Sequence, residues 1–318
     1  MINYIRHNDI DKARWDECIR FSVNSRVYAY SWYLDIVSPG WDGLVDENWE
    51  SVFPLTHRRK GVISYLYQPF FTQQLGLFSR IHLTGSMLND FLAAIPAKFR
   101  FIEIHLNSLN KIDSCNYQVQ VRLNHELDLI KAYENMLSNY SQNTRRNIQK
   151  AIESGVSIGR KVEVDELISL FRENFGKKEN ILRFSDYITL RKLLLHARES
   201  DLGQVTGAYS VDGSLSAAAF FLKDAARVYY LFAASAPQAR ENGAMFLLID
   251  HFIRENALQR LTLDFEGGND TGLGRFYKSF GAKEIPYYQL RINRLNWPVK
   301  NCINLIRRFS GREKAILL

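Results

Sequence analysis

The sequence predicts an α/β protein with a mixed α+β sheet, divided into about two domains. The chain has 318 residues, and a domain usually has roughly 100–200. Hydrophobic residues make up 46% and charged residues 24% of it, which is typical of a globular protein with a substantial core. Antiparallel strands followed by a strand–helix–strand crossover in the second half indicate a mixed sheet.

The first half of the sequence is predicted to form short strands among helices. Asp9 or Asp11 can cap a helix that ends near Phe21. Further helices are expected at 28–37 and 87–97, and strands at 41–45, 51–57, 62–66, 101–105 and 117–123. An aromatic, glutamine-rich segment lies at 67–76.

The middle of the chain reads as helical, and we expect the domain boundary there. Helices are predicted at 125–133 and 136–140, followed by a basic helix at 143–155 that ends at a glycine. This gives an N-terminal domain at 1–135 and a C-terminal domain at 136–290.

In the second half of the sequence, the expected helices and strands alternate more regularly. Its expected elements are a strand at 156–162, helices at 165–175 and 185–200, strands at 204–211, 215–223 and 227–234, a helix at 240–256, a strand at 260–265, a helix at 272–280 and a strand at 283–292. Asp212-Gly213 is a strong hairpin signal between two of these strands.

The positive charge is concentrated at the C-terminus. Of the net charge of +7, residues 291–318 contribute +6 and residues 1–290 only +1. Apolar residues at helical spacing predict a basic amphipathic C-terminal helix there: Val299, Cys302, Ile303, Ile306 and Phe309. We expect this helix to dock on the body, with peripheral membrane contact as the second reading and nucleic acid as another.

Several classes of protein are disfavoured. No apolar run approaches the roughly 20 residues that span a bilayer, and the N-terminus lacks the apolar run of a secretory signal, so a cytoplasmic location is expected. The three cysteines and seven histidines show no metal-ligand spacing, so no metal site is expected. Gly155–Gly159 matches G-x-S-x-G, but the expected helix precedes it and the strand follows, the reverse of a nucleophile elbow.

The segment 238–245 follows an expected strand and opens an apolar helix. Backbone amides at a helix N-terminus can bind phosphate oxygens, and a glycine allows close approach. An ordinary tight turn explains the same residues and, on this feature alone, is the preferred explanation.

A resemblance to a known family extends this reading. Arg240-x-x-Gly243-Ala244 resembles the acyl-CoA pyrophosphate loop of the GNAT superfamily of N-acyltransferases, with Met245 where a small residue is expected. Residues 272–283 resemble the closing segment of that superfamily. The basic helix 145–151, the segment 263–267 and the Gly-x-Phe-x-Lys-x-Phe-Gly pattern at 274–281 together resemble its FemABX-like branch, in which two GNAT-type domains lie in tandem. The first half of the chain resembles that branch only in its size and in its mixture of strands and helices.

The resemblance implies a tandem GNAT-like fold and transfer of an acyl or aminoacyl group to an amine. The donor would be acyl-CoA or aminoacyl-tRNA, used as a substrate rather than held as a permanent cofactor, and tRNA would then be a partner. The acceptor would be a small or nucleotide-linked molecule, such as a cell-wall or polysaccharide precursor. The rivals are an acyl-CoA-dependent enzyme acting on a small amine or amino sugar, and a non-catalytic binding protein with the same fold.

The candidate site residues follow from this chemistry. The donor-binding residues would be Arg240, Asn242, Gly243 and Ala244. Amine attack on a carbonyl needs positioning, oxyanion donors and groups that move protons, for which the candidates are Asp264, Glu266 and Tyr277. A salt bridge for Asp264 and core packing for Tyr277 are the alternatives.

Phosphates of the acceptor or of tRNA need cations. The candidates are Arg145, Arg146, Lys150 and Lys278, since guanidinium binds phosphate bidentately and ammonium binds it as a point charge. A solvated helix face is the alternative for the first three.

Overall fold

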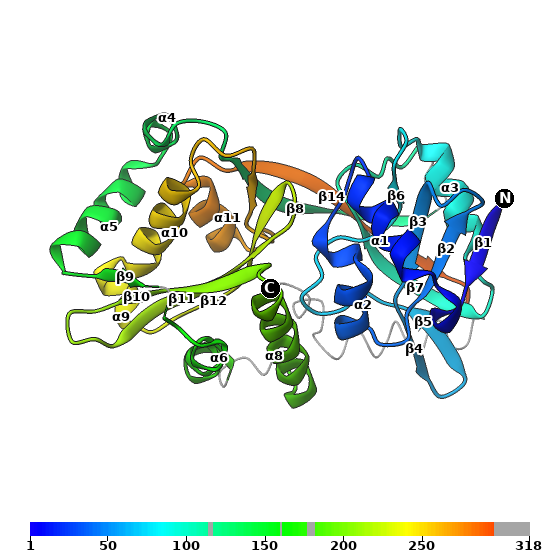
Figure 1. Ribbon diagram of the computed structural model, residues 1–318, viewed down its shortest axis with the longest axis horizontal. Coiled ribbons are helices and arrows are strands. Elements are labelled where there is room, and N and C mark those ends of the chain that lie inside the picture. Colours follow the sequence, from blue (N-terminus) through cyan, green and yellow to red (C-terminus); the bar gives the residue numbers. More distant parts are fainter. Residues whose placement is uncertain (114–116, 160, 177–181, 296–318) are drawn as a thin grey trace. The chain divides into compact units, whose positions relative to one another are not determined.

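The structure is a computed structural model that describes residues 1–113, 117–159, 161–176 and 182–295 (Figure 1). Its contacts divide the chain into two units. Unit 1 consists of Met1–Leu123 and the chain from Pro286 onward, and unit 2 consists of Asn124–Ile285. By these contacts, residues 124–135 group with unit 2, although the domain boundary expected from sequence lies after them. The expected C-terminal helix lies largely outside the described residues.

Unit 1 contains two sheets. The first has the order β1-β2-β3-β6, and the second runs β4-β5-β7-β14-β8. Its elements are β1 (Ile2–Ile5), α1 (Lys12–Phe21), α2 (Ser31–Val37), β2 (Asp42–Asp46), β3 (Ser51–Leu55), β4 (His57–Lys60), β5 (Ile63–Leu66), β6 (Phe78–Ser79), α3 (Gly85–Ala94) and β7 (Phe99–Leu106), with short 3-10 turns at His7–Asp9 and Val27–Ala29. Strands β8 (Gln118–Asp128) and β14 (Lys283–Asn293) each run from one unit into the other.

Local signals explain several elements of unit 1. The Asp11 carboxylate accepts hydrogen bonds from the amides of Ala13 and Arg14, so α1 begins where its cap predicts. Strand β7 alternates, with Ile102, Ile104 and Leu106 in the hydrophobic core.

Unit 2 is a mixed sheet with helices on both faces. Its strands follow the order β8-β13-β12-β11-β10-β9, all antiparallel except the β12–β13 pair, which is parallel. Its elements are α4 (Tyr133–Ser138), α5 (Gln142–Glu153), β9 (Ser157–Gly159), α6 (Val164–Phe171), a π-helical turn (Arg172–Gly176), α8 (Phe184–Glu199), β10 (Gly203–Tyr209), β11 (Leu215–Lys223), β12 (Arg227–Ser235), α9 (Gln238–Asn242), α10 (Ala244–Glu255), β13 (Thr262–Asp264) and α11 (Thr271–Lys278). Helices α5, α10 and α11 lie on one side of the sheet, and α6 and α8 on the other (Figure 1).

The core of unit 2 lies between the sheet and α10. The ring of Phe221 on β11 stacks on Phe252 of α10, with centroids 3.8 Å apart. Leu248, Ile249 and Ile253 of the same helix are fully buried, and burying one such side chain contributes about 1.5–3 kcal/mol. The apolar stripe of α10 therefore fixes this helix on the sheet.

The structure confirms the mixed α/β class and corrects two of the expected elements. The helix expected at 125–133 is wrong, because β8 continues to Asp128 and pairs antiparallel with β13. The helix expected at 240–256 is two helices, separated at Gly243, whose φ of 71° lies in the left-handed region.

Candidate functional site

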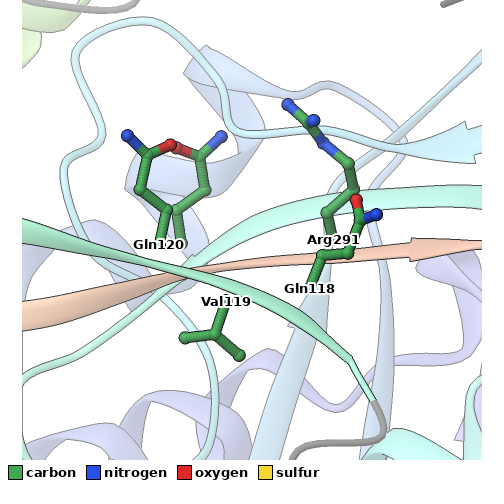
Figure 2. A pocket seen from close by; sticks show the side chains of 5 residues that line it. Gln118, Val119, Gln120 and Arg291 are labelled. Carbon is green, nitrogen blue, oxygen red and sulfur yellow. The ribbon is translucent and has the colours of Figure 1, made fainter.

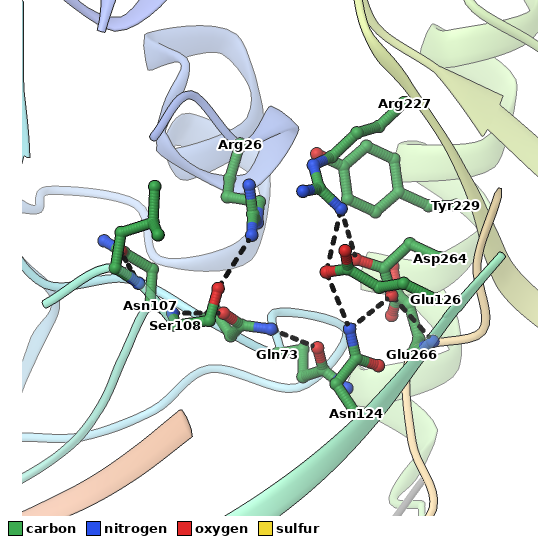
Figure 3. A network of polar contacts seen from close by, with 12 residues as sticks. Arg26, Gln73, Asn107, Ser108, Asn124, Glu126, Arg227, Tyr229, Asp264 and Glu266 are labelled. Atoms are coloured by element: carbon green, nitrogen blue, oxygen red, sulfur yellow. Dashed lines mark hydrogen bonds and ion pairs between the residues drawn. The ribbon is translucent and has the colours of Figure 1, made fainter. Parts of the chain in front are cut away.

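Asp264 is a buried carboxylate at the end of β13, and its partners are all polar. Its Oδ1 atom accepts hydrogen bonds from Asn124 Nδ2 at 2.9 Å and from the Glu266 amide at 3.0 Å. Its Oδ2 atom lies 3.6 Å from Nη1 of Arg227. The side chain thus caps the turn after the strand and joins an ion pair, the alternative that the sequence left open (Figure 3).

Arg227 connects two carboxylates on neighbouring strands. Its Nη1 atom lies 2.8 Å from Glu126 on β8, and Glu126 and Asp264 stand opposite each other in the β8–β13 register. Burial by itself would lower the pKa of Arg227, but the carboxylates of Glu126 and Asp264 raise it above the usual value for arginine. The guanidinium therefore stays charged between the two carboxylates.

Glu266 follows in an unusual backbone conformation. Its φ is +54°, in the left-handed region that residues with a side chain rarely adopt. The turn is held on both sides, by the bond from the Glu266 amide to Asp264 and by a 3.2 Å bond from the Gly267 amide to Asn124 Oδ1. Backbone held in this way costs about 1–3 kcal/mol and is concentrated at functional sites.

Tyr277 is a core aromatic. Its ring lies against Phe265 with centroids 4.7 Å apart and 22° between the planes. Burial, and to a lesser extent the nearby carboxylates of Glu266 and Asp270, raise the pKa of its hydroxyl above the ordinary tyrosine value. The hydroxyl keeps its proton at neutral pH and can act as a donor.

The expected donor loop is closed by bonds within the chain. The Gly243 amide donates to the carbonyl of Ala239 at 3.1 Å, and the Ala244 amide donates to Asn242 Oδ1 at 3.0 Å. The Asn242 side chain in turn donates to Ser210 Oγ at 3.1 Å. Two amides that would face a pyrophosphate therefore already donate hydrogen bonds within the chain.

Close packing explains the glycine of this loop. A Cβ atom at Gly243 would lie 2.3 Å from the backbone oxygen of Asn147 on α5. The glycine is thus needed for the approach of α5 as well as for its own left-handed φ. Arg240 is exposed on α9.

The basic residues of α5 lie on its outer side. Thr144, Ile148 and Ala151 are buried, whereas the candidate cations are exposed: Arg145, Arg146 and Lys150. Arg145 donates to the carbonyl of Ser138 at 2.8 Å. Arg146 and Lys150 are four residues apart and therefore neighbours on the helix surface, and no ion pair joins either of them to another described residue.

Side chains tie α5 to the end of α11. Thr144 Oγ1 donates to Ser279 Oγ at 2.7 Å, and the Ser141 amide donates to the Ser279 carbonyl at 2.8 Å. At the last turn of α11, Lys278 Nζ donates to Glu284 Oε1 at 3.0 Å. The structure thus brings Asp264 and Glu266 together at one strand end, and connects the helix that carries Lys278 to α5.

Sequence reasoning missed three members of this polar cluster, namely Asn124, Glu126 and Arg227. The available signal was a charged or amide side chain inside a strand-like segment, since such residues are seldom buried unless they have partners. The sequence predicts a helix over Glu126, and this prediction conceals its position opposite Asp264.

Unit 1 has a small pocket of its own, lined by Gln118, Val119, Gln120, Gln289 and Arg291 (Figure 2). Arg291 Nε donates to Glu103 Oε2 at 2.9 Å. Gln289 accepts from Arg122 Nε at 2.8 Å and donates to Glu103 Oε1 at 3.1 Å. These bonds form a connected network that fixes the pocket wall.

Among residues 1–113, 117–159, 161–176 and 182–295, no group of three or more His, Cys, Asp or Glu side chains is arranged to hold a metal ion. Over the same residues, no helix has the length and apolar character needed to cross a membrane.

Comparison with known proteins identifies the kind of fold. Residues 138–279 match the acetyltransferase (GNAT) domain family. The chain is similar to the crystal structure of FemX, with a TM-score of 0.63 and 14% identity over 92% of this chain and 98% of that one. Residues 138–279 therefore form a GNAT-type domain. Over most of its length the chain shares the fold of FemX.

Two further solved structures have the same fold. One is L-PGS from Bacillus licheniformis, with a TM-score of 0.54 and 10% identity over 95% of this chain and 97% of that one. The other is the C-terminal domain of a putative lysylphosphatidylglycerol synthetase from Agrobacterium fabrum, with a TM-score of 0.54 and 14% identity over 93% and 95%. No curated protein matches the sequence.

Proposed function

We propose that this protein transfers an aminoacyl group from aminoacyl-tRNA to the amine of a small or nucleotide-linked acceptor. The observation that carries the proposal is the closed donor loop. Because the amides of Gly243 and Ala244 are bonded inside the chain, this helix end does not offer these two donors to the pyrophosphate of acyl-CoA.

The exposed cations of α5 support a polyanionic donor. Arg146 and Lys150 present two positive charges on adjacent turns, and such a surface attracts phosphates through counterion release. The bonds from α5 to Ser279 hold this surface next to the end of α11.

The reaction forms a bond between the acceptor nitrogen and the aminoacyl carbon, and breaks the ester bond to the tRNA ribose. The amine loses one proton, and the departing ribose oxygen gains one. Glu266 is the proposed proton acceptor because bonds to Asp264 and Asn124 hold the turn from which its carboxylate extends. Asp264 is better suited to orienting the turn, since Arg227 and Asn124 already bind it. Lys278 would bind acceptor phosphate.

The test measures binding of total tRNA across a series of salt concentrations, for the wild type and for the variants Arg146→Ala and Lys150→Ala. We expect the affinity to fall steeply with salt, and each variant to reduce the slope of log K against log [salt] by about 1. Lys192→Ala is the matched control, because Lys192 is an exposed lysine on α8, and it should leave the slope unchanged.

A parallel thermal-shift titration with coenzyme A and acetyl-CoA separates the rivals. Ligand that binds only the folded state raises the melting temperature. A rise that is lost in Arg240→Ala would replace the proposal with acyl-CoA-dependent transfer. Binding of neither donor would favour a non-catalytic protein.

A further inference from the structure

His125 is a fully buried histidine at the centre of the candidate site, and neither its sequence context nor the proposed chemistry assigns it a role. It lies on β8 between Asn124 and Glu126. Its side chain is 0% exposed, and a buried polar ring of this kind needs an explanation for both nitrogens.

The first nitrogen holds the turn after β13. Nδ1 lies 2.8 Å from the carbonyl oxygen of Gly267. A carbonyl oxygen only accepts, so Nδ1 carries the hydrogen. The backbone of the same residue adds a second contact, because the Phe265 amide donates to the His125 carbonyl at 3.0 Å.

The shape of the following segment fits the imidazole ring. A Cβ atom at Gly268 would lie 2.1 Å from Nδ1 and Cε1 of His125, and one at Gly274 would lie 3.4 Å from Cε1. Two glycines, one before α11 and one inside it, therefore make room for this ring. The ring also lies 5.8 Å from that of Tyr277.

The second nitrogen faces the partner of Lys278. Nε2 makes no hydrogen bond and lies 3.8 Å from Glu284 Oε1. The same carboxylate oxygen accepts the 3.0 Å bond from Lys278 Nζ. One imidazole thus contacts the turn that carries Glu266 on one side and faces the carboxylate that holds Lys278 on the other.

We infer that His125 is a positioning residue, which fixes the left-handed turn at Glu266 through its bond to Gly267. The inference deepens the proposed function, since Glu266 belongs to its site. His125 itself touches no substrate in this role.

The test is hydrogen exchange of the segment 265–271 in His125→Asn and His125→Gln. An asparagine amide can replace Nδ1 as donor to Gly267, whereas the glutamine amide reaches the position of Nε2. We expect exchange in this segment to rise about tenfold in His125→Gln, the effect of losing one buried hydrogen bond, and to stay within about threefold in His125→Asn. Equal effects in the two variants, or none, would overturn the inference.

His251→Gln is the matched control. This histidine of α10 also faces a glutamate through Nε2, at 3.4 Å from Glu255 Oε2. It should leave exchange in 265–271 unchanged. A rise spread over all of unit 2 in both His125 variants would show a general packing role and contradict the inference.

The exchange measurement requires neither a donor nor an acceptor, so the inference can stand if aminoacyl transfer is not found. If transfer is found, His125→Gln should lower kcat with little change in KM.

Discussion

Arg227 is the residue on which the charge balance of the candidate site depends. It is the cation between Glu126 and Asp264, and both carboxylates are largely or fully buried. Taking away one member of a buried ionic group leaves its partners without compensation, which costs more than the group contributes in total. The cluster is therefore sensitive to the loss of this one side chain.

The variant Arg227→Met tests this sensitivity. It keeps the apolar stem but leaves two buried carboxylates facing each other, so the free energy of unfolding should fall by about 3 kcal/mol. Urea unfolding at neutral pH measures it. Arg254→Met is the control, because Arg254 is 62% exposed and lies 4.0 Å from Asp250, and its loss should cost less than about 1 kcal/mol. Similar losses in both variants would contradict the role of burial.

Among the helices and strands, the predictions that rest on signals within a few residues are confirmed. The capping residue of α1, the basic helix α5, the hairpin at Asp212-Gly213 and the β11 strand all lie where the sequence predicts them. Each depends on a cap, a turn residue or a periodicity that acts locally.

The wrong secondary-structure prediction falls where contacts with residues distant in the sequence determine the structure. Residues 126–129 alternate polar and apolar side chains, a period-2 pattern that fits a strand, yet the run of three polar residues at 124–126 also fits a helix. Pairing of Glu126 with Asp264, 138 positions further along the chain, settles the choice in favour of β8. The role of His125 was hidden for the same reason, because its partners Gly267 and Glu284 are equally remote.

The junction between α9 and α10 gives a prediction at this scale. Gly243→Ala combines a left-handed φ with a Cβ atom 2.3 Å from the Asn147 carbonyl, so α5 must move away. We expect a loss of about 3 kcal/mol in unfolding free energy. Gly213→Ala has a similar φ of 80° but meets nothing within 4 Å, so it should cost only about 1 kcal/mol. Chemical denaturation of the two variants measures the difference, and equal losses would show that the close approach of α5 is unimportant.

For the molecule as a whole, the two units differ in how acid affects them. In unit 1, burial by itself would raise the pKa of Asp42, but bonds from His57, Tyr4 and the His7 amide lower it to about 2. A carboxylate with a lowered folded-state pKa stabilises the fold above its ordinary pKa, and this stabilisation is lost as the pH falls. In unit 2, burial raises the pKa of Asp250, so protonation there favours the folded state.

Unit 1 should therefore unfold first when the pH is lowered from about 4 towards 2. The protonation of Asp42 removes about 2 kcal/mol from its stability over that range. Tryptophan fluorescence can follow unit 1 alone, since residues 124–285 contain no tryptophan and Trp15 and Trp41 are fully buried in unit 1. The fluorescence transition should precede the loss of helical circular dichroism, to which α5, α8 and α10 of unit 2 contribute.

The variant Asp42→Asn assigns the effect to this carboxyl group. It should lower the stability of unit 1 at pH 7, because the charged partner of His57 and Lys98 is lost, and it should reduce the further loss between pH 4 and 2. Asp35→Asn is the control, since Asp35 pairs with Lys12 at 2.8 Å but is one-third exposed. It should keep the acid response of the wild type. Coincident fluorescence and circular dichroism transitions in the wild type would mean that the two units unfold together, and that the protonation of Asp42 acts on the stability of the whole chain.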